Sequence, residues 1–476
     1  MNIIVDLSSL SEFFSLPPET MLWRFMAYYG WIIIAIMFLY FAKEMWLIKV
    51  QTDYCQKVKH LLLAIDIPRA NEQSPRAVEN MLAYLAGAHA TLNWFEKYWE
   101  GKCQQYFSFE IVSIDGYTQF IIRTPVDFRY LVESAVYSQY PDAEISEIDD
   151  YTEGLPRKFP NEEYDVWGAE FIQVSNQMFP IKFYEEFEHK LGPDETYYKD
   201  PMASLMDLCS SLQKGEQLWY QILVIPTGFD WVKEADVEVD KIMGKEPKVS
   251  FVNGLIDGVV DIIGVISEAI YSIWGDVETK EKEFTPLKML DLKPKQKKQV
   301  EALHEKTAKI GFLAKLRMVY IAKKEVFLPK KVANGFVGYI KQFAALDLNS
   351  FKPDMDYTAT STTYFAKVKR LNERKTRIVN NYINRDAGSG RTPGLFNIAE
   401  LASVWHFPLE ASTNAPLVQK APMKKAKPPL ALPTEENISV WQEALEPIYS
   451  LDDKKAADNN PIEAEADTPP SNLPLG

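Results

Sequence analysis

The stretch FSFEIVSIDGYTQFIIRTP, residues 107–125, predicts the structural unit on which the soluble part of this chain is built. Phe107, Phe109 and Ile111 alternate with polar or smaller side chains, which is the period of a strand that turns one face to a core. Asp115-Gly116 favours a two-residue hairpin turn, and a second strand-like run follows it. The sequence therefore predicts a β-hairpin.

Helical patterns flank this hairpin on both sides. Ser74-Pro75 is typical of a helix start, and an apolar face at helical spacing continues from Val78 to Trp99, where Gly101 ends it. A second helix begins at Val126, and the strand AEISEI (143–148) comes after it. Helix, hairpin, helix and strand predict a first α+β unit over residues 49–150.

A similar order returns after residue 200. Asp200-Pro201 begins a helix, Gly215 stops it, and the strands QLWYQILVIP (217–226) and GFLAKLRMVYIA (311–322) follow, with a helix after the second. We predict two diverged α/β-sandwich (ferredoxin-like) units, each with helices against one face of a largely antiparallel sheet. The second spans 200–350 with an insertion at 226–307, and residues 151–199 connect the two units.

The insertion holds the amphipathic stretch FVNGLIDGVVDIIGVISEAIYSIW, residues 251–274, whose polar face is acidic. One interpretation is a helix that covers its own domain, and the other is a helix that binds a partner groove or a second copy.

Residues 25–42, FMAYYGWIIIAIMFLYFA, contain no charge and as a helix reach roughly 27 Å at ~1.5 Å per residue, enough to cross a bilayer core. We predict a short extracytoplasmic N-terminus (1–24) and a transmembrane helix (25–48); the alternative is a buried core helix. The proposed membrane anchors are Trp23, Tyr29, Trp31, Ile34, Leu39 and Trp46.

Lysines at 43, 49, 57 and 59 follow the apolar run, whereas Arg24 alone precedes it. The positive-inside rule therefore predicts a single-pass protein of the inner (cytoplasmic) membrane, with its N-terminus outside and its body cytoplasmic. Three widely spaced cysteines encode no disulfide framework, which suits a reducing compartment.

The formal charge of −14 argues against a general nucleic-acid coat. Scattered histidines and cysteines predict no metal site, and no catalytic signature or cofactor motif occurs.

The Gly-rich stretch DAGSGRTPG (386–394) lacks the Lys-Ser/Thr pair of a phosphate-binding loop, so we expect an ordinary loop. The pairs Asp149-Asp150 and Glu162-Glu163 are expected to be solvated turn charges unless the fold brings them to a cleft. The prediction is a protein that is not an enzyme.

The C-terminal region (351–420) is predicted to be a strap that contains a basic helix, and residues 421–476 to be a Pro-rich, acidic and disordered tail. A solvated helix face is one meaning of the basic run, and contact with phosphates or a partner is the other. The candidate contact residues are Lys367, Lys369, Arg370, Arg374 and Arg377.

Several segments together resemble the membrane-anchored N-terminal region of conjugation-type, type IV secretion ATPases of candidate-phylum bacteria. The resemblance runs in collinear order over about residues 70–433 and rests on SPRAVENMLAYLAG (74–87), the hairpin at 107–125, VESAVYSQYPDAEISEIDDYT (132–152), DPMASLMDLCSSLQKGEQLWYQILV (200–224), KQFAALDLNSFKP (341–353), ELASVWHFP (400–408) and KPPLALP (427–433). In the longer relatives the last two elements lead into a hexameric motor, which is expected to be absent here.

The resemblance implies a membrane-anchored, non-catalytic assembly module of a conjugative or type IV secretion-like apparatus. Its expected partners are membrane lipid and a separately encoded P-loop ATPase, with self-association as a further option. The alternative hypothesis is a membrane-tethered nucleic-acid-binding protein that uses the basic run at 367–377.

Overall fold

The computed structural model describes residues 17–68, 71, 73–190, 196–198, 200–243, 292–363, 366–409 and 424–425. The predicted insertion helix (251–274), most of the predicted tail and residues 1–16 lie outside these ranges. The described helices, including short 3₁₀ and π segments (η), are α2 (Pro18–Cys55), α3 (Arg76–Leu85), η1 (Ala86–Ala88), η2 (Glu96–Glu100), η3 (Val126–Phe128), α4 (Arg129–Gln139), η4 (Tyr184–Phe187), α5 (Met202–Ser210), α6 (Trp231–Ile242), α8 (Pro294–Thr307), α9 (Pro329–Lys341), α10 (Lys367–Ile383) and α11 (Ile398–Val404).

Ten of the described strands form one antiparallel sheet, and β6 (Glu188–Lys190) and β7 (Thr196–Tyr198) form a small second one. The main sheet has the order β10-β5-β9-β8-β2-β3-β1-β4-β12, and β11 also pairs with β9. Its strands are β1 (His60–Asp66), β2 (Phe107–Ile114), β3 (Tyr117–Pro125), β4 (Glu144–Ile148), β5 (Tyr164–Gln173), β8 (Glu216–Pro226), β9 (Gly311–Lys323), β10 (Phe351–Pro353), β11 (Gly394–Asn397) and β12 (Lys424–Lys425). The predicted α+β class with an antiparallel sheet is confirmed.

The predicted hairpin forms the start of this sheet. Ile114 pairs with Tyr117 across a two-residue turn, and Asp115 and Gly116 both have positive φ, at 55° and 88°. Because a type I′ turn needs positive φ at both central positions, Asp-Gly is well suited to it. Local chemistry therefore sets the register between β2 and β3.

The same order of elements occurs twice along the chain. The first half reads β1-α3-β2-β3-α4-β4 and has the strand order β4-β1-β3-β2. In the second half the main elements are β5-α5-β8-β9-α9-β10, with the order β10-β5-β9-β8. The two halves join edge to edge where Glu110 of β2 pairs with Gln221 of β8, so one sheet runs through both predicted units.

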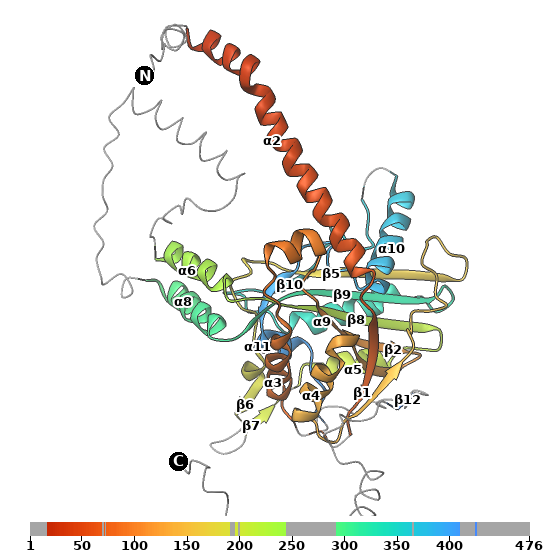
Figure 1. Ribbon diagram of the computed structural model, residues 1–476. Coiled ribbons are helices and arrows are strands. Elements are labelled where there is room, and N and C mark those ends of the chain that lie inside the picture. Colours follow the sequence, from red (N-terminus) through yellow and green to blue (C-terminus); the bar gives the residue numbers. More distant parts are fainter. Residues whose placement is uncertain are drawn as a thin grey trace, which may run out of the picture. The chain divides into compact units, whose positions relative to one another are not determined.

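Both faces of the sheet are covered. The largest apolar cluster contains side chains of β2, β8 and β9 together with α3, α4, α5, α9 and α11, and α10 lies on the other face (Figure 1). There Ile378, Val379 and Tyr382 pack with Trp219 and Val112. The sequence predicted helices against one face; the second face is covered as well because it carries an apolar cluster of its own.

Several strands were not recognised as parts of the predicted units, and β1 and β5 are the longest of them. β1 contains five consecutive buried residues, Leu61 to Ile65, and therefore shows no alternation. β5 comes from the predicted connecting segment and lies between β9 and β10. The long helix predicted from residue 74 to Gly101 is interrupted: α3 ends at Leu85, η1 follows it, and residues 89–93 are not helical before the π-helical turn η2.

The segment ELASVWHFP (400–408) lies inside the core. Glu400 is 2.9 Å from Lys306 Nζ, and His406 Nε2 is 2.9 Å from Asp200 Oδ1, with all four side chains buried. Trp405 packs edge-on against Phe109 of the first half at 4.9 Å between ring centroids. This C-terminal segment therefore ties both halves of the sheet together.

Candidate functional site: a buried charge network beneath the basic helix

Four polar side chains cross the centre of the sheet on the face that α10 covers. Glu110 of β2 pairs in register with Gln221 of β8, Gln221 with Arg317 of β9, and Arg317 with Glu170 of β5. All four are buried, with at most 1% of each exposed. Because the side chains of directly paired residues lie on the same face, register alone aligns them into one row.

Arg317 forms hydrogen bonds to β5, to α10 and to the loop that follows α10. Its Nε donates to Glu170 Oε1 at 2.8 Å, and Nη1 donates to the Asn381 carbonyl at 2.9 Å. Nη2 donates to the carbonyl oxygens of Ser389, at 2.9 Å, and of Asp386. The guanidinium therefore fixes the chain that leaves α10 against the sheet.

Arg385 holds the other end of the row. It contacts Glu110 through Nε at 3.1 Å and Nη2 at 3.3 Å, and it binds both carboxylate oxygens of Asp150. Burial acts to raise the pKa of Glu110, but Arg385 outweighs burial and the pKa is lowered. Asp150 was expected to be a solvated turn charge unless the fold placed it in a cleft; the fold brings it to the buried guanidinium of Arg385, and 26% of its side chain remains exposed.

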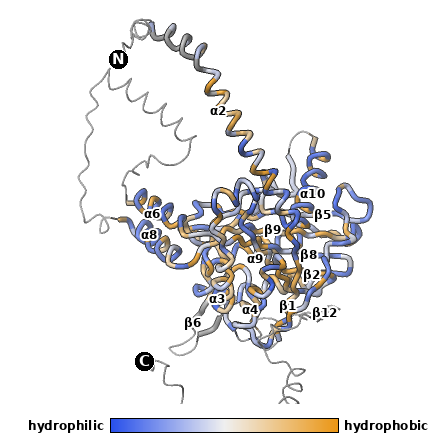
Figure 2. The backbone as a smooth tube through the Cα atoms, viewed as in Figure 1, coloured by the Kyte–Doolittle hydropathy of each residue, from blue (hydrophilic) through white to orange (hydrophobic). Residues whose placement is uncertain are grey.

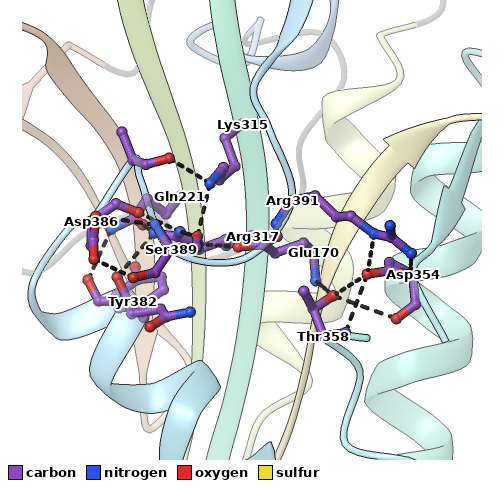
Figure 3. Close-up of polar contacts among 12 residues, drawn as sticks. Glu170, Gln221, Lys315, Arg317, Asp354, Thr358, Tyr382, Asp386, Ser389 and Arg391 are labelled. Atoms are coloured by element: carbon purple, nitrogen blue, oxygen red, sulfur yellow. Dashed lines mark hydrogen bonds and ion pairs between the residues drawn. The ribbon is translucent and has the colours of Figure 1, made fainter. Parts of the chain in front are cut away.

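The Gly-rich loop 386–394 lies on this network (Figure 3). Lys315 Nζ donates to the carbonyls of Ala387 at 2.6 Å and Ser389 at 2.8 Å, while the backbone N–H of Arg391 donates to Glu170. Gly390 has φ of 93°, and a Cβ there would lie 2.3 Å from Glu170 Oε1. The loop carbonyls thus accept from a lysine, and the loop N–H groups that could bind an anion already donate to carboxylates: those of Gly388 and Ser389 to Asp386, and that of Arg391 to Glu170.

Arg391 continues the network outward. Its Nε and Nη2 each donate to one oxygen of Asp354 at 3.0 Å, a bidentate pair. A cavity of about 450 Å³ adjoins this pair and is lined in part by Lys315, Lys352 and Asp356. Burial lowers the pKa of Lys315 to about 8, the direction expected for an ammonium held away from water.

Each arginine of this network is paired with a carboxylate. Arg317 with Glu170, Arg385 with Glu110, and Arg391 with Asp354 are each in direct contact, and backbone carbonyls of α10 and the loop accept further donors of the first two arginines. Among the described residues no group of three or more His, Cys, Asp or Glu side chains is placed to hold a metal ion. The network therefore positions the loop and α10 on the sheet.

The basic residues predicted on α10 divide into two sets. Arg374 donates to the carbonyls of Met355 at 3.0 Å and Ala359 at 3.2 Å, and the Arg377 guanidinium lies 4.4 Å from the centroid of the Tyr357 ring. These two arginines hold a neighbouring loop. The exposed set is Lys367, Lys369 and Arg370.

A groove of about 620 Å³ runs between α10 and residues 157–160. Its basic lining residues are Arg157 and Lys158 from the loop and Lys369 and Arg377 from α10. Cations from two separate segments thus meet beside the exposed part of the basic helix. The predicted contact residue Lys369 is one of them.

The proposed membrane anchors lie on α2. Five of them are exposed by about half or more of their surface: Trp23 (77%), Trp31 (65%), Ile34 (70%), Leu39 (67%) and Trp46 (48%). The side chain of the sixth, Tyr29, lies outside the described residues. Gly30–Cys55 is long and apolar enough to span a membrane, with a mean hydropathy of 1.8, and none of its most apolar window is buried.

Sequence analysis did not find the residues of the charge network. Arg385 and Glu110 are 275 positions apart, so local spacing cannot pair them. One signal was available: Gln221 and Arg317 stand inside mostly apolar runs, and a polar side chain inside a strand that is buried on both faces indicates a buried partner.

The fold and this network define an α+β protein with one large antiparallel sheet, a buried charge network and a candidate membrane helix. Residues 62–419, more than half of the chain, match the family model described as Domain of unknown function (DUF8128), and the chain belongs to this family. No curated protein and no solved structure matches it in our comparisons.

Proposed function

We propose that this protein is a membrane-anchored, non-catalytic assembly module of a conjugative or type IV secretion-like apparatus, which docks or co-assembles with a separately encoded P-loop ATPase. The observation that carries the proposal is α2, whose apolar side chains Trp31, Ile34 and Leu39 are exposed along a continuous 38-residue helix. Exposed apolar surface of this length is stable in lipid.

The two halves support a scaffold role. We infer that each half is a ferredoxin-like unit, because the strand orders β4-β1-β3-β2 and β10-β5-β9-β8 correspond position by position. The polar groups on the sheet are occupied by one another, as Arg317 and Arg385 show. A sheet locked in this way is a rigid platform, which suits assembly better than turnover.

The type of apparatus rests on the resemblance of the segments at 74–87, 107–125 and 400–408 to secretion ATPases. In this proposal, the lysines that follow the apolar run keep the body on the cytoplasmic side of the membrane, where ATP is available to an ATPase.

Membrane anchoring is tested by alkaline extraction of membranes from cells that express the full chain. Ile34→Arg with Leu39→Arg should release the protein, since each arginine at a helix centre costs about 2.5–3.5 kcal/mol of insertion free energy. Leu346→Arg is the matched control, because Leu346 lies outside the helix and is 95% exposed. This variant protein should remain in the membrane fraction. Wild-type protein in the soluble fraction would refute anchoring.

Assembly is tested by affinity purification of the full chain from detergent extracts, followed by mass spectrometry and light scattering. We expect a P-loop ATPase to co-purify in defined stoichiometry. A strictly monomeric protein that recovers no ATPase would refute the assembly role and leave anchoring untouched.

The second candidate function is nucleic-acid binding at the membrane. The groove that brings Arg157 and Lys158 beside Lys369 favours it, since cations from two segments can follow a phosphate backbone. Lys369→Glu with Arg370→Glu should weaken binding and flatten its salt dependence in filter-binding titrations. Wild-type protein without salt-sensitive affinity would exclude this function.

A further inference from the structure

An exposed group of aromatic side chains lies around η2. Trp94 is 71% exposed, Phe95 51% and Trp99 64%, although these large rings are usually at least half buried. The rings pack against each other: Phe95 and Trp99 stack with centroids 6.2 Å apart, and Trp94 and Tyr98 lie 5.6 Å apart. We call Trp94, Phe95, Tyr98 and Trp99 the aromatic turn.

The aromatic turn is fixed against α2. Trp46 Nε1 donates to the carbonyl of Tyr98 at 2.9 Å, and the rings of Trp46 and Trp99 are 6.3 Å apart. Gly101, with φ of 73°, ends η2, and a Cβ there would lie only 2.3 Å from the carbonyl oxygen of Val50. Glycine is therefore required for this close approach of the two backbones.

The position along α2 places the aromatic turn at one end of the apolar run. That run covers residues 25–42, and Lys43 follows it with Nζ 5.6 Å from the centroid of the Tyr98 ring. Trp46 and Val50 lie about one and two turns further on, at 3.6 residues per turn. If residues 25–42 cross the hydrocarbon core, the aromatic turn is level with the headgroups.

The charges beside the rings balance, because Glu96, Glu100, Lys97 and Lys102 together carry no net charge. Lys102 Nζ lies 3.0 Å from Glu96 and 2.9 Å from Glu100, so the two carboxylates of η2 share one ammonium. Apart from Glu100 and Lys97, whose Nζ lies 5.6 Å from the centroid of the Tyr98 ring, the exposed side chains of residues 94–100 are tryptophan and phenylalanine rings. Such rings with one polar atom prefer the membrane–water interface, where the ring is apolar and the N–H stays hydrated.

We propose that the aromatic turn inserts into the headgroup region of the bilayer as a second membrane contact beside α2. This inference rests on the proposed anchoring by α2 and adds to it a fixed orientation of the body. The aromatic turn is continuous with the exposed apolar residues of α2, and Figure 2 shows hydrophobic residues along this helix in orange. Interfacial elements of this kind reach about 5–10 Å into the headgroup and acyl boundary.

Depth-dependent fluorescence quenching tests the inference on the full chain. The background carries Cys55→Ser and Cys103→Ser, and the remaining Cys209 is buried and will not react with label. Single cysteines replace Trp94, Trp31 or Tyr130 and receive an environment-sensitive dye. The protein is reconstituted in phosphatidylcholine vesicles that contain lipid with a nitroxide near the headgroup end of its acyl chain.

Tyr130 on α4 is the matched control, because it is an aromatic residue of the body with 63% exposure. We expect the nitroxide lipid to cause loss of fluorescence at positions 94 and 31 and no loss at 130. Quenching at 31 without quenching at 94 overturns the second contact and leaves the anchor standing. Absence of quenching at 31 overturns both.

A second labelling site shows whether the substitution at position 94 has disrupted the structure around it. Trp99→Cys, on the next turn of the same segment, should be quenched like position 94, and near-UV circular dichroism should match that of the parent. Folded protein with both positions unquenched, while position 31 is quenched, refutes the proposal.

Discussion

Replacing Arg385 with Met should destabilise the folded protein by about 3–5 kcal/mol, because it leaves a buried carboxylate without its cation. Arg385 is 2% exposed and Glu110 is fully buried, and two of the hydrogen bonds of Arg385 go to that carboxylate. Methionine keeps an unbranched apolar stem in place of the arginine stem, so the change mainly removes the guanidinium with its charge and hydrogen bonds.

The magnitude follows from what remains around Glu110. Ser108 Oγ still donates at 2.6 Å, Tyr151 OH at 2.7 Å and Gln221 Nε2 at 3.0 Å. These neutral donors do not replace a cation at a fully buried carboxylate, so burial then dominates and raises the pKa of Glu110. Asp150 is partly exposed and loses less, because water takes the place of its partner.

The assay is urea unfolding of the full chain in detergent, followed by tryptophan fluorescence. The defect of Arg385→Met should be largest near neutral pH and should shrink on acidification. A carboxyl whose folded pKa is raised contributes stability below its unfolded pKa and loses it as pH rises. Adding Glu110→Gln should recover much of the loss, because it removes the unpaired charge.

Arg370→Met is the control. Arg370 is exposed on α10, and its replacement should change the free energy of unfolding by no more than about 0.5 kcal/mol. An Arg385→Met protein as stable as this control, or a double variant no more stable than Arg385→Met, would refute the reasoning.

The other predictions concern pH, thiol chemistry and backbone strain. Burial, with Arg123 second, lowers the pKa of His60 from 6.5 to about 4, so stability should fall as pH drops through this range, and His60→Gln should remove that loss from urea titrations. The Sγ atoms of Cys55 and Cys103 lie 2.9 Å apart, so oxidised glutathione should convert both thiols into one intramolecular disulfide, detected by thiol titration. Gly390→Ala should cost about 1–3 kcal/mol in the same urea assay, since φ is 93°. Gly338→Ala, on an exposed helix position with open space, should stabilise by about 0.5–1 kcal/mol.

Each of these predictions would be contradicted by a specific outcome. A pH profile unchanged in His60→Gln would remove the histidine from the acid response. Two thiols that stay free in oxidant would contradict the contact between α2 and the segment after η2. Equal effects of alanine at positions 390 and 338 would show that loop 386–394 is not held in the strained conformation described here.

Local pattern was sufficient wherever one short stretch carries the whole signal. The alternation before Asp115-Gly116 predicted the hairpin, and the uncharged run at 25–42 predicted a helix of membrane length; the structure contains both. The same approach missed β1, since a strand buried on both faces shows no alternation, and it left β5 in a connecting segment.

What the sequence alone determined, then, is the type of element, because hydrogen bonding, turn chemistry and hydrophobic spacing act over a few residues. Tertiary structure alone decided which charges meet. Arg385 reaches Glu110 across 275 positions, and Arg317 reaches Glu170 across 147, through strand register and the return of the chain after α10. In a dry interior an unpaired charge is costly, so these partners are fixed by the packing of the whole sheet.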